Sequence, residues 1–173
     1  TTAGPRMSKA GRKFKRCLDY VSTPGYESAM DIGGQLSSAV WNSDSGISWE
    51  ESCAYLGASM VDLVDCLGEK GAAVRYKVEG RRAFCPVNFM RSVLIQERPD
   101  LVVTTCHVRM ERAAVIASNQ LGIVNVRIED LFGYSLLGEY SVHRPPQLLP
   151  REEWPDEVVV LNDEVKRRIV EAG

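Results

Sequence analysis

The hydrophobic positions in the second half of the chain alternate between short apolar runs and stretches with helical spacing. The run at 73–78 repeats with period two, which is typical of a strand. The run at 101–105 is too uniformly apolar for a half-exposed strand and fits a buried parallel one. Two similar runs follow further along the chain. The pattern therefore predicts four strands, near residues 73–78, 101–105, 123–128 and 157–161.

Helical spacing of the apolar residues separates these strands. A helix over 86–97 opens at Pro86, and a helix over 109–121 is closed by Gly122. A last short helix follows Asn162, whose side chain suits the capping position. Strands that alternate with helices in this way are typical of an α/β protein. The sequence predicts a Rossmann-like, open and mainly parallel sheet with helices on both faces.

The chain before residue 72 is less regular. Ser48 and Glu51 form a capping-box pattern, and the apolar stripe after them predicts a helix that ends near Gly68 and Gly71. Residues 25–47 mix small and polar residues with isolated apolar ones and show no sustained period. The sequence therefore leaves that segment irregular.

The first sixteen residues form a basic arm that carries no acidic residue. The arm runs into a predicted amphipathic helix that stops at Pro24 and Gly25. Such an arm either contacts phosphate or is a solvated helix face. At 173 residues the chain fits one domain over 1–173, in which 1–47 hold the arm, the helix and the irregular segment and 72–173 hold the clearest alternation.

Composition places the chain among ordinary globular proteins. Hydrophobic residues make up 45% and charged residues 25%, and a net charge of -2 gives the whole molecule no electrostatic reason to bind nucleic acid or an anionic membrane. The apolar runs are far shorter than the roughly 20 residues of a membrane span.

The five cysteines are an odd number and form no C-x-x-C pair, which indicates neither a disulfide framework nor a zinc cluster. We expect reduced thiols in a cytoplasmic protein.

Candidate chemistry gathers where two of the predicted strands end. Ligands of open parallel sheets bind outside the carboxyl ends of the strands, where the following helices point their amino ends. Thr104, Thr105 and His107 stand at or after the end of the strand at 101–105, and Glu129 and Asp130 follow the strand at 123–128. His107 suits acid–base catalysis or a hydrogen bond to a ligand hydroxyl, although a capping histidine would look the same.

The charged residues near these strand ends allow further assignments. Arg109 and Arg112 lie in the first turn of a helix, where cations oppose the helix dipole, so an anion is expected there unless Glu111 offsets them. Glu129 and Asp130 can accept hydrogen bonds from sugar hydroxyls or hold a base, or Asp130 can cap the next turn. The candidate catalytic residues are therefore His107, Glu129 and Asp130, and the candidate substrate-binding residues include Thr104, Thr105 and Arg109.

Gly33 and Gly34 complete the candidate substrate-binding set, because adjacent glycines let the backbone approach a phosphate closely. The chain has neither G-x-x-x-x-G-K-[ST] nor G-x-G-x-x-G, so neither a P-loop nucleotidase nor an ordinary dinucleotide enzyme is supported. No metal site is predicted.

Three segments of the second half resemble a known family. They are an R-P-D-hydrophobic strand at 98–105, a helix of small residues that runs into L-G-I-V at 113–124, and D-E-V-V-V-L-N-D-E at 156–164. Together they resemble the latter half of the amino-terminal domain of two-domain (GT-B fold) glycosyltransferases and sugar-nucleotide 2-epimerases. The resemblance covers roughly residues 90–173.

This resemblance implies the acceptor-binding half of a glycosyltransferase-like enzyme. A nucleotide sugar would be the co-substrate, a sugar acceptor would be the second ligand, and no other cofactor would be needed. Catalysis would require a second, donor-binding domain, for which no room remains after Gly173. The alternative is a non-catalytic α/β module that binds a nucleotide, a sugar or a partner protein at the same strand ends.

Overall fold

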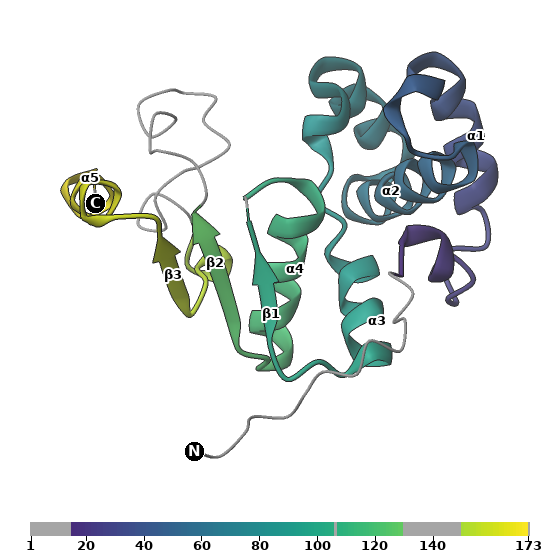
Figure 1. Ribbon diagram of the computed structural model, residues 1–173. Helices are drawn as coiled ribbons and strands as arrows, with labels where there is room; N and C mark the ends of the chain where they lie inside the picture. Colours follow the sequence, from purple (N-terminus) through teal and green to yellow (C-terminus); the bar gives the residue numbers. More distant parts are fainter. Residues whose placement is uncertain (1–14, 106, 130–149, 173) are drawn as a thin grey trace.

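The computed structural model describes residues 15–105, 107–129 and 150–172 (Figure 1). Two helices, α1 (Ala29–Val40) and α2 (Trp49–Glu79), form a helical part that precedes an α/β part. The α/β part contains α3 (Val87–Glu97), β1 (Val102–Thr104), α4 (Arg109–Leu121), β2 (Asn125–Glu129), β3 (Glu157–Val160) and α5 (Asp163–Ala172). Short 3-10 turns lie at Cys17–Asp19, Ser43–Ser45, Gly80–Ala83 and, as η6, at Arg151–Glu153.

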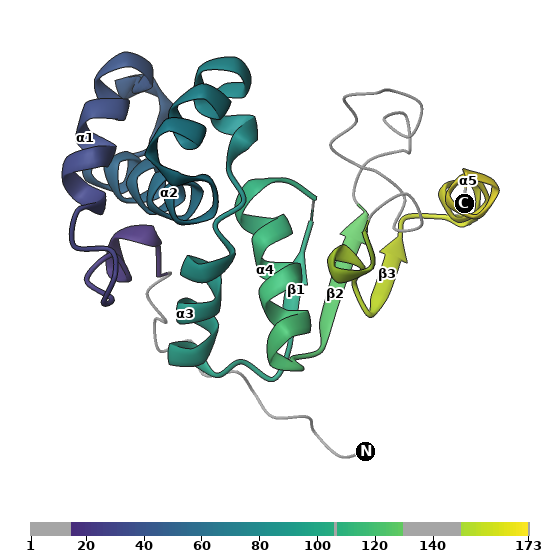
Figure 2. The ribbon, with the colours of Figure 1, turned by 180° about the vertical axis from the view of Figure 1, so that it is seen from behind.

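The three described strands form one parallel sheet in the order β1-β2-β3. Val103 is in register with Val126, and Arg127 is in register with Val158. Helix α4 connects β1 to β2 and packs against both strands and against α3 (Figure 2). The predicted strands near 101–105, 123–128 and 157–161 are therefore confirmed as parallel neighbours. The molecule has an α/β fold with a small sheet.

The predicted strand at 73–78 is wrong, because α2 continues to Glu79. Gly68, with φ of 70° and ψ of 164°, breaks the helical backbone, so that α2 consists of two helical halves that meet at a kink. Val74 and Val78 lie four residues apart on an exposed side of the helix, while Tyr76 stacks on Phe84 with ring centroids 5.3 Å apart. The period-two pattern of these residues is thus two helix faces, one exposed and one packed.

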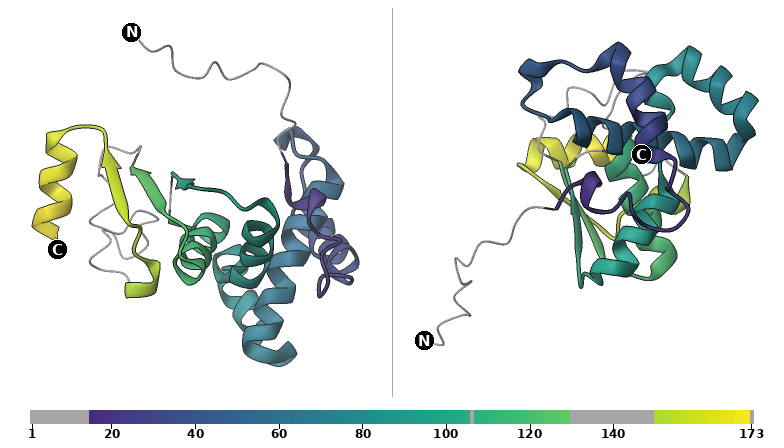
Figure 3. Two further views of the ribbon diagram at one scale, coloured as in Figure 1. Left: turned by 90° about the horizontal axis from the view of Figure 1, so that it is seen from below. Right: turned by 90° about the vertical axis from the view of Figure 1, so that its right-hand side faces the viewer.

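The segment that the sequence left irregular contains α1. Gly33 lies where α1 crosses α2, and a Cβ atom on it would stand 1.8 Å from the carbonyl oxygen of Cys53. Gly57 makes the reciprocal approach, since its Cβ would stand 1.7 Å from the carbonyl oxygen of Ala29. Large apolar residues cannot occupy such a crossing, so the usual periodic signal is weak here. Figure 3 shows α1 and α2 lying against each other, apart from the strands.

The predicted amphipathic helix before Pro24 is not found in the described residues. The chain forms the short 3-10 turn Cys17–Asp19 there, and the arm over 1–14 lies outside the described residues. Glu51 accepts hydrogen bonds from the backbone amides of Cys17 and Leu18, at 3.0 and 3.1 Å. These bonds tie the turn to the first turn of α2.

Buried Asp62 joins the helical part to α3. Its Oδ2 atom accepts from the backbone amides of Asn88 (2.7 Å) and Phe89 (3.2 Å) in the first turn of α3, and its Oδ1 atom accepts from the Tyr26 hydroxyl. The ring of Tyr26 also packs edge-on against Phe89, with centroids 5.1 Å apart. A side chain of α2 therefore supplies the cap that Pro86 cannot give to α3.

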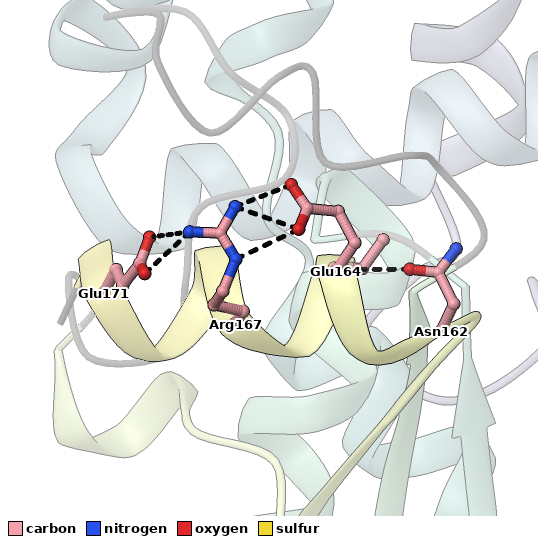
Figure 4. A network of polar contacts seen from close by, with 5 residues as sticks. Asn162, Glu164, Arg167 and Glu171 are labelled. Carbon is pink, nitrogen blue, oxygen red and sulfur yellow. Dashed lines mark hydrogen bonds and ion pairs between the residues drawn. The ribbon is translucent and has the colours of Figure 1, made fainter.

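Helix α5 has the cap that the sequence predicts. Asn162 Oδ1 accepts from the backbone amide of Val165 at 3.0 Å, and Val165 is fully buried. On the solvent side Arg167 bonds to both Glu164 and Glu171, one turn before and one turn after it (Figure 4). Such pairs on an exposed face add a few tenths of a kcal/mol each.

The structure also bears on membrane spans and on the cysteines. Among residues 15–105, 107–129 and 150–172, no helix combines the length and the apolar character of a membrane span. Cys17, Cys53, Cys66 and Cys85 are free thiols.

Candidate functional site at the carboxyl end of β1

The junction between β1 and α4 lies at the carboxyl end of the sheet. Thr104 ends β1 with 3% of its surface exposed and is in register with Arg127 of β2, which is 1% exposed. Residues in register on parallel strands point to the same face of the sheet. Two buried polar side chains therefore lie side by side on one face.

His107, between β1 and α4, is buried beside a carboxylate from a distant part of the chain. Its Nε2 atom lies 2.7 Å from Oε2 of Glu153 in η6, and both side chains are 5% exposed. Arg112 donates from Nε to the same oxygen at 2.9 Å and from Nη2 to the other oxygen. The sequence leads us to expect an anion near Arg109 and Arg112 unless Glu111 offsets them, and in the structure Glu153 is the anion that pairs with Arg112.

The electrostatics of this trio set its protonation state. Burial, the largest effect, lowers the pKa of His107 below 6.5, against the opposing effect of Glu153. Burial raises the pKa of Glu153, but the hydrogen bonds from Arg112 and His107 outweigh it and lower the pKa below 4.5. At neutral pH the histidine is therefore neutral and the glutamate ionised. An ionised carboxylate only accepts hydrogen bonds, so Nε2 carries the proton and Nδ1 is an acceptor.

Two buried polar atoms at this junction have no hydrogen-bond partner in the part of the chain that the structure describes. They are Oγ1 of Thr104 and Nδ1 of His107. An unsatisfied buried polar group costs about 1–3 kcal/mol. A ligand that reached both atoms would remove this cost.

The other predicted site residues of this junction have different neighbours. Glu111 accepts from the amide of Thr105 and, at 3.3 Å, from its hydroxyl, so the glutamate caps the turn before α4. Arg109 lies in the left-handed region with φ of 50°. Burial raises the pKa of Tyr55 in α2, and the positive charge of nearby Arg109 opposes that effect.

The other candidate residues, from β2 and from the glycine pair, lie in different parts of the chain. Glu129 is the last residue of β2, and Asp130 lies outside the described residues. Gly33 and Gly34 lie inside α1, where Gly33 serves the helix crossing and a Cβ on Gly34 would meet no atom within 4 Å. The structure therefore places Thr104 beside Arg127 on one face of the sheet and His107 in the loop that follows β1, and it does not bring the glycine pair to the sheet.

Sequence reasoning missed Glu153, although it is the partner of His107. This residue stands between Pro150 and Pro155, in a stretch that reads as an irregular loop. A long-range contact of this kind has no periodic signature. The unusual position of Arg112 in the first turn of α4 is the signal that could have pointed to a missing anion.

A metal site is not apparent in the described ranges. Among residues 15–105, 107–129 and 150–172, no three or more His, Cys, Asp and Glu side chains gather as metal ligands would.

The chain is similar to a known protein. The chain is 28% identical over 178 aligned positions to a protein named 5'-nucleotidase SurE from Parvibaculum lavamentivorans (strain DS-1). The alignment covers 89% of this chain and 62% of the relative, so the chain spans less than two thirds of the relative's length. No protein-family model matches the chain. No solved structure matches it either.

This comparison corrects the function expected from sequence. The segments at 98–105, 113–124 and 156–164 resemble a GT-B half-domain, but the similarity that extends over most of the chain is to a nucleotidase. The predicted glycosyltransferase-like activity, with its sugar acceptor and nucleotide-sugar co-substrate, is therefore wrong. A strand, a helix of small residues and a second strand make up a general α/β unit, and so they do not separate these families.

Proposed function

We propose that this chain binds a nucleoside 5'-phosphate at the carboxyl end of β1, beside the amino end of α4. The observation that carries the proposal is the pair of buried polar atoms, Thr104 Oγ1 and His107 Nδ1, that have no partner among the described residues. The similarity to a 5'-nucleotidase over 89% of the chain names the ligand class. The general rule for ligands of parallel sheets agrees with this position.

Each part of the nucleotide has a complementary group at this junction. Helix α4 has no side-chain cap at Val108, so the amides of its first turn suit a phosphate. Arg127 places a buried positive charge beside Thr104. Nδ1 of neutral His107 accepts from a hydroxyl rather than donating to the phosphate. Thr105, Arg109, Glu129 and Asp130 stay in the proposal as further contacts, the carboxylates for ribose hydroxyls.

We also propose that residues 1–173 form one domain. Its sheet would have a Rossmann-like arrangement with helices on both faces. The proposal also places the protein in the cytoplasm, because the thiols of Cys17, Cys53, Cys66 and Cys85 are free.

Calorimetric titration of the purified chain with AMP, adenosine and inorganic phosphate tests this proposal. We expect AMP to bind at least about tenfold more tightly than adenosine, which corresponds to about 1.4 kcal/mol. Equal affinities for AMP and adenosine would show that the phosphate is not recognised. Absence of binding by AMP and by the other common nucleoside 5'-monophosphates would refute the proposal.

A second candidate function is hydrolysis of the phosphate ester. The name of the relative favours it, as does the Glu153–His107 pair, in which a carboxylate orients an imidazole whose other nitrogen is a free base. In this step Nδ1 takes a proton from water as the water oxygen bonds to phosphorus. The bond between phosphorus and the 5' oxygen breaks, and the proton passes to that oxygen.

Release of phosphate from AMP distinguishes the two functions. A hydrolase releases phosphate with turnover, and H107Q then lowers kcat by about 100-fold, since general-base catalysis contributes roughly 10²–10⁴-fold. The glutamine retains a side chain that can bond to Glu153. Tight AMP binding without phosphate release would support nucleotide binding and exclude hydrolysis.

A further inference from the structure

The half of α2 that follows the bend at Gly68 carries an apolar stripe that no described residue covers. Val74 and Val78 in this half are 65% and 74% exposed, and Leu67, just before the bend, is 48% exposed. With Gly71 they line a groove of about 560 Å³, which we name the α2 groove. This half of the helix lies at the periphery of the molecule, away from the strands (Figure 3).

The spacing of the stripe after the bend is that of a helix-pairing seam. Gly71, Val74 and Val78 follow one another at intervals of three and four residues, and Leu67, which lies before the break at Gly68, borders them in the groove. Apolar residues at these intervals form the a and d positions of a heptad repeat, which pack against a partner helix. The opposite side of α2 is already used, because Ala72 is buried and Tyr76 stacks on Phe84. The stripe is therefore not needed for the core that the described residues form.

The charges beside the groove identify the kind of partner. Lys70, Arg75 and Glu79 line the groove, and residues 69–82 carry five basic side chains against two acidic ones, Glu69 and Glu79. Glu79 is paired with Arg75, its Oε1 atom lying 2.8 Å from the arginine Nε. A second copy of the chain would bring like charges together along the seam, which is unfavourable. An acidic surface is complementary to it.

We propose that the α2 groove docks an amphipathic helix of a partner protein that has apolar residues at heptad spacing and acidic residues beside them. This proposal does not rest on nucleotide binding, because the groove lies on the helical part and the strand ends lie on the α/β part.

Two fluorescent helical peptides of about 20 residues provide the probes. Both carry Leu at a and d; the acidic probe carries Glu at e and g, and the basic probe carries Lys there. We expect the acidic probe to bind the full chain at least about tenfold more tightly than the basic probe in fluorescence anisotropy. The double variant V74D/V78D should weaken binding of the acidic probe by about tenfold or more. V170D, which changes a valine that is 64% exposed on α5, is the matched control and should leave it unchanged.

A charge-swap variant makes the test independent of the apolar residues. K70E/R75E should reverse the preference and favour the basic probe. Equal binding of the two probes, or no loss in V74D/V78D, would overturn the proposal. If light scattering finds a dimer of the chain that becomes a monomer in V74D/V78D, the groove is a self-association surface and the partner-helix proposal is wrong. If the chain binds anionic vesicles and the acidic probe cannot compete with them, the groove is a membrane-binding surface and the partner-helix proposal is wrong.

Discussion

The Nε2 atom of His107 lies 2.7 Å from Oε2 of Glu153, although 46 residues separate them in the sequence. This bond attaches η6 to the loop between β1 and α4, and Arg112 completes the contact from the helix. The residue that the sequence marks as an acid–base candidate is thus also the point where two distant segments are held together. Protonation of His107 should therefore change the stability of the fold as well as the binding of a ligand.

Stability should fall on acidification. His107 has a lowered pKa in the folded state, so the unfolded chain binds a proton near pH 6.5 that the folded chain does not. The free energy of unfolding therefore falls as the pH decreases through 6.5. Glu153, also lowered, adds a further loss as the pH falls through 4.5. Urea unfolding between pH 8 and pH 4 measures this, and H107Q should flatten the upper part of the profile.

Removing the charge of Glu153 should destabilise the protein. E153Q leaves Arg112 without its carboxylate, and we expect a loss of about 2–3 kcal/mol, below the roughly 3–5 kcal/mol of a fully buried pair because Arg112 is partly exposed. The neighbouring Glu152 is exposed and serves as a control. E152Q should change the free energy of unfolding by less than about 0.5 kcal/mol. Similar losses in both variants would contradict the role assigned to Glu153.

The crossing of α1 and α2 gives a prediction with an internal control. G33A places a methyl group 1.8 Å from the carbonyl oxygen of Cys53, so the two helices must move apart. We expect a loss of more than about 3 kcal/mol, at or beyond the upper end of ordinary overpacking. G34A, one residue further on, meets no atom and should stabilise the helix by up to about 1 kcal/mol. Thermal unfolding of both variants measures the difference, and a stable G33A would show that the helices cross less closely.

Local patterns predicted the elements whose packing is local. The helix at 109–121 and its glycine cap follow from apolar spacing and from Gly122, which has φ of 67°. The strands β1, β2 and β3 follow from compact apolar runs between turn signals. The segment at 73–78 was misassigned because Val74, Tyr76 and Val78 have the residue types of a strand. Alternation over six residues cannot separate a strand from a helix whose two sides are both apolar.

The place of the candidate residues in the fold was predictable, but their contacts were not. The strand-end rule expects Thr104, Thr105 and His107 at the end of β1 and before α4, and the structure has them there; their role as a site stays a prediction. It could not locate Glu153, because the partner of a buried histidine is fixed by how a distant segment folds back. It also placed Gly33 in a phosphate loop, whereas the absence of a side chain there serves a helix crossing.

The hydroxyl of Thr104 separates a role in ligand binding from a role in folding. Oγ1 is buried and has no partner among the described residues, so T104V removes an unsatisfied polar atom and keeps the shape of the side chain. We expect the variant to be as stable as the parent or more stable by up to about 1 kcal/mol. If the hydroxyl contacts the nucleotide, the same change should weaken AMP binding by about tenfold, which is about 1.4 kcal/mol. Thermal unfolding with and without AMP measures both effects in one experiment. A parent-like AMP-induced rise in Tm in T104V would remove Thr104 from the site, and a large loss of stability without AMP would show that the hydroxyl has a structural partner.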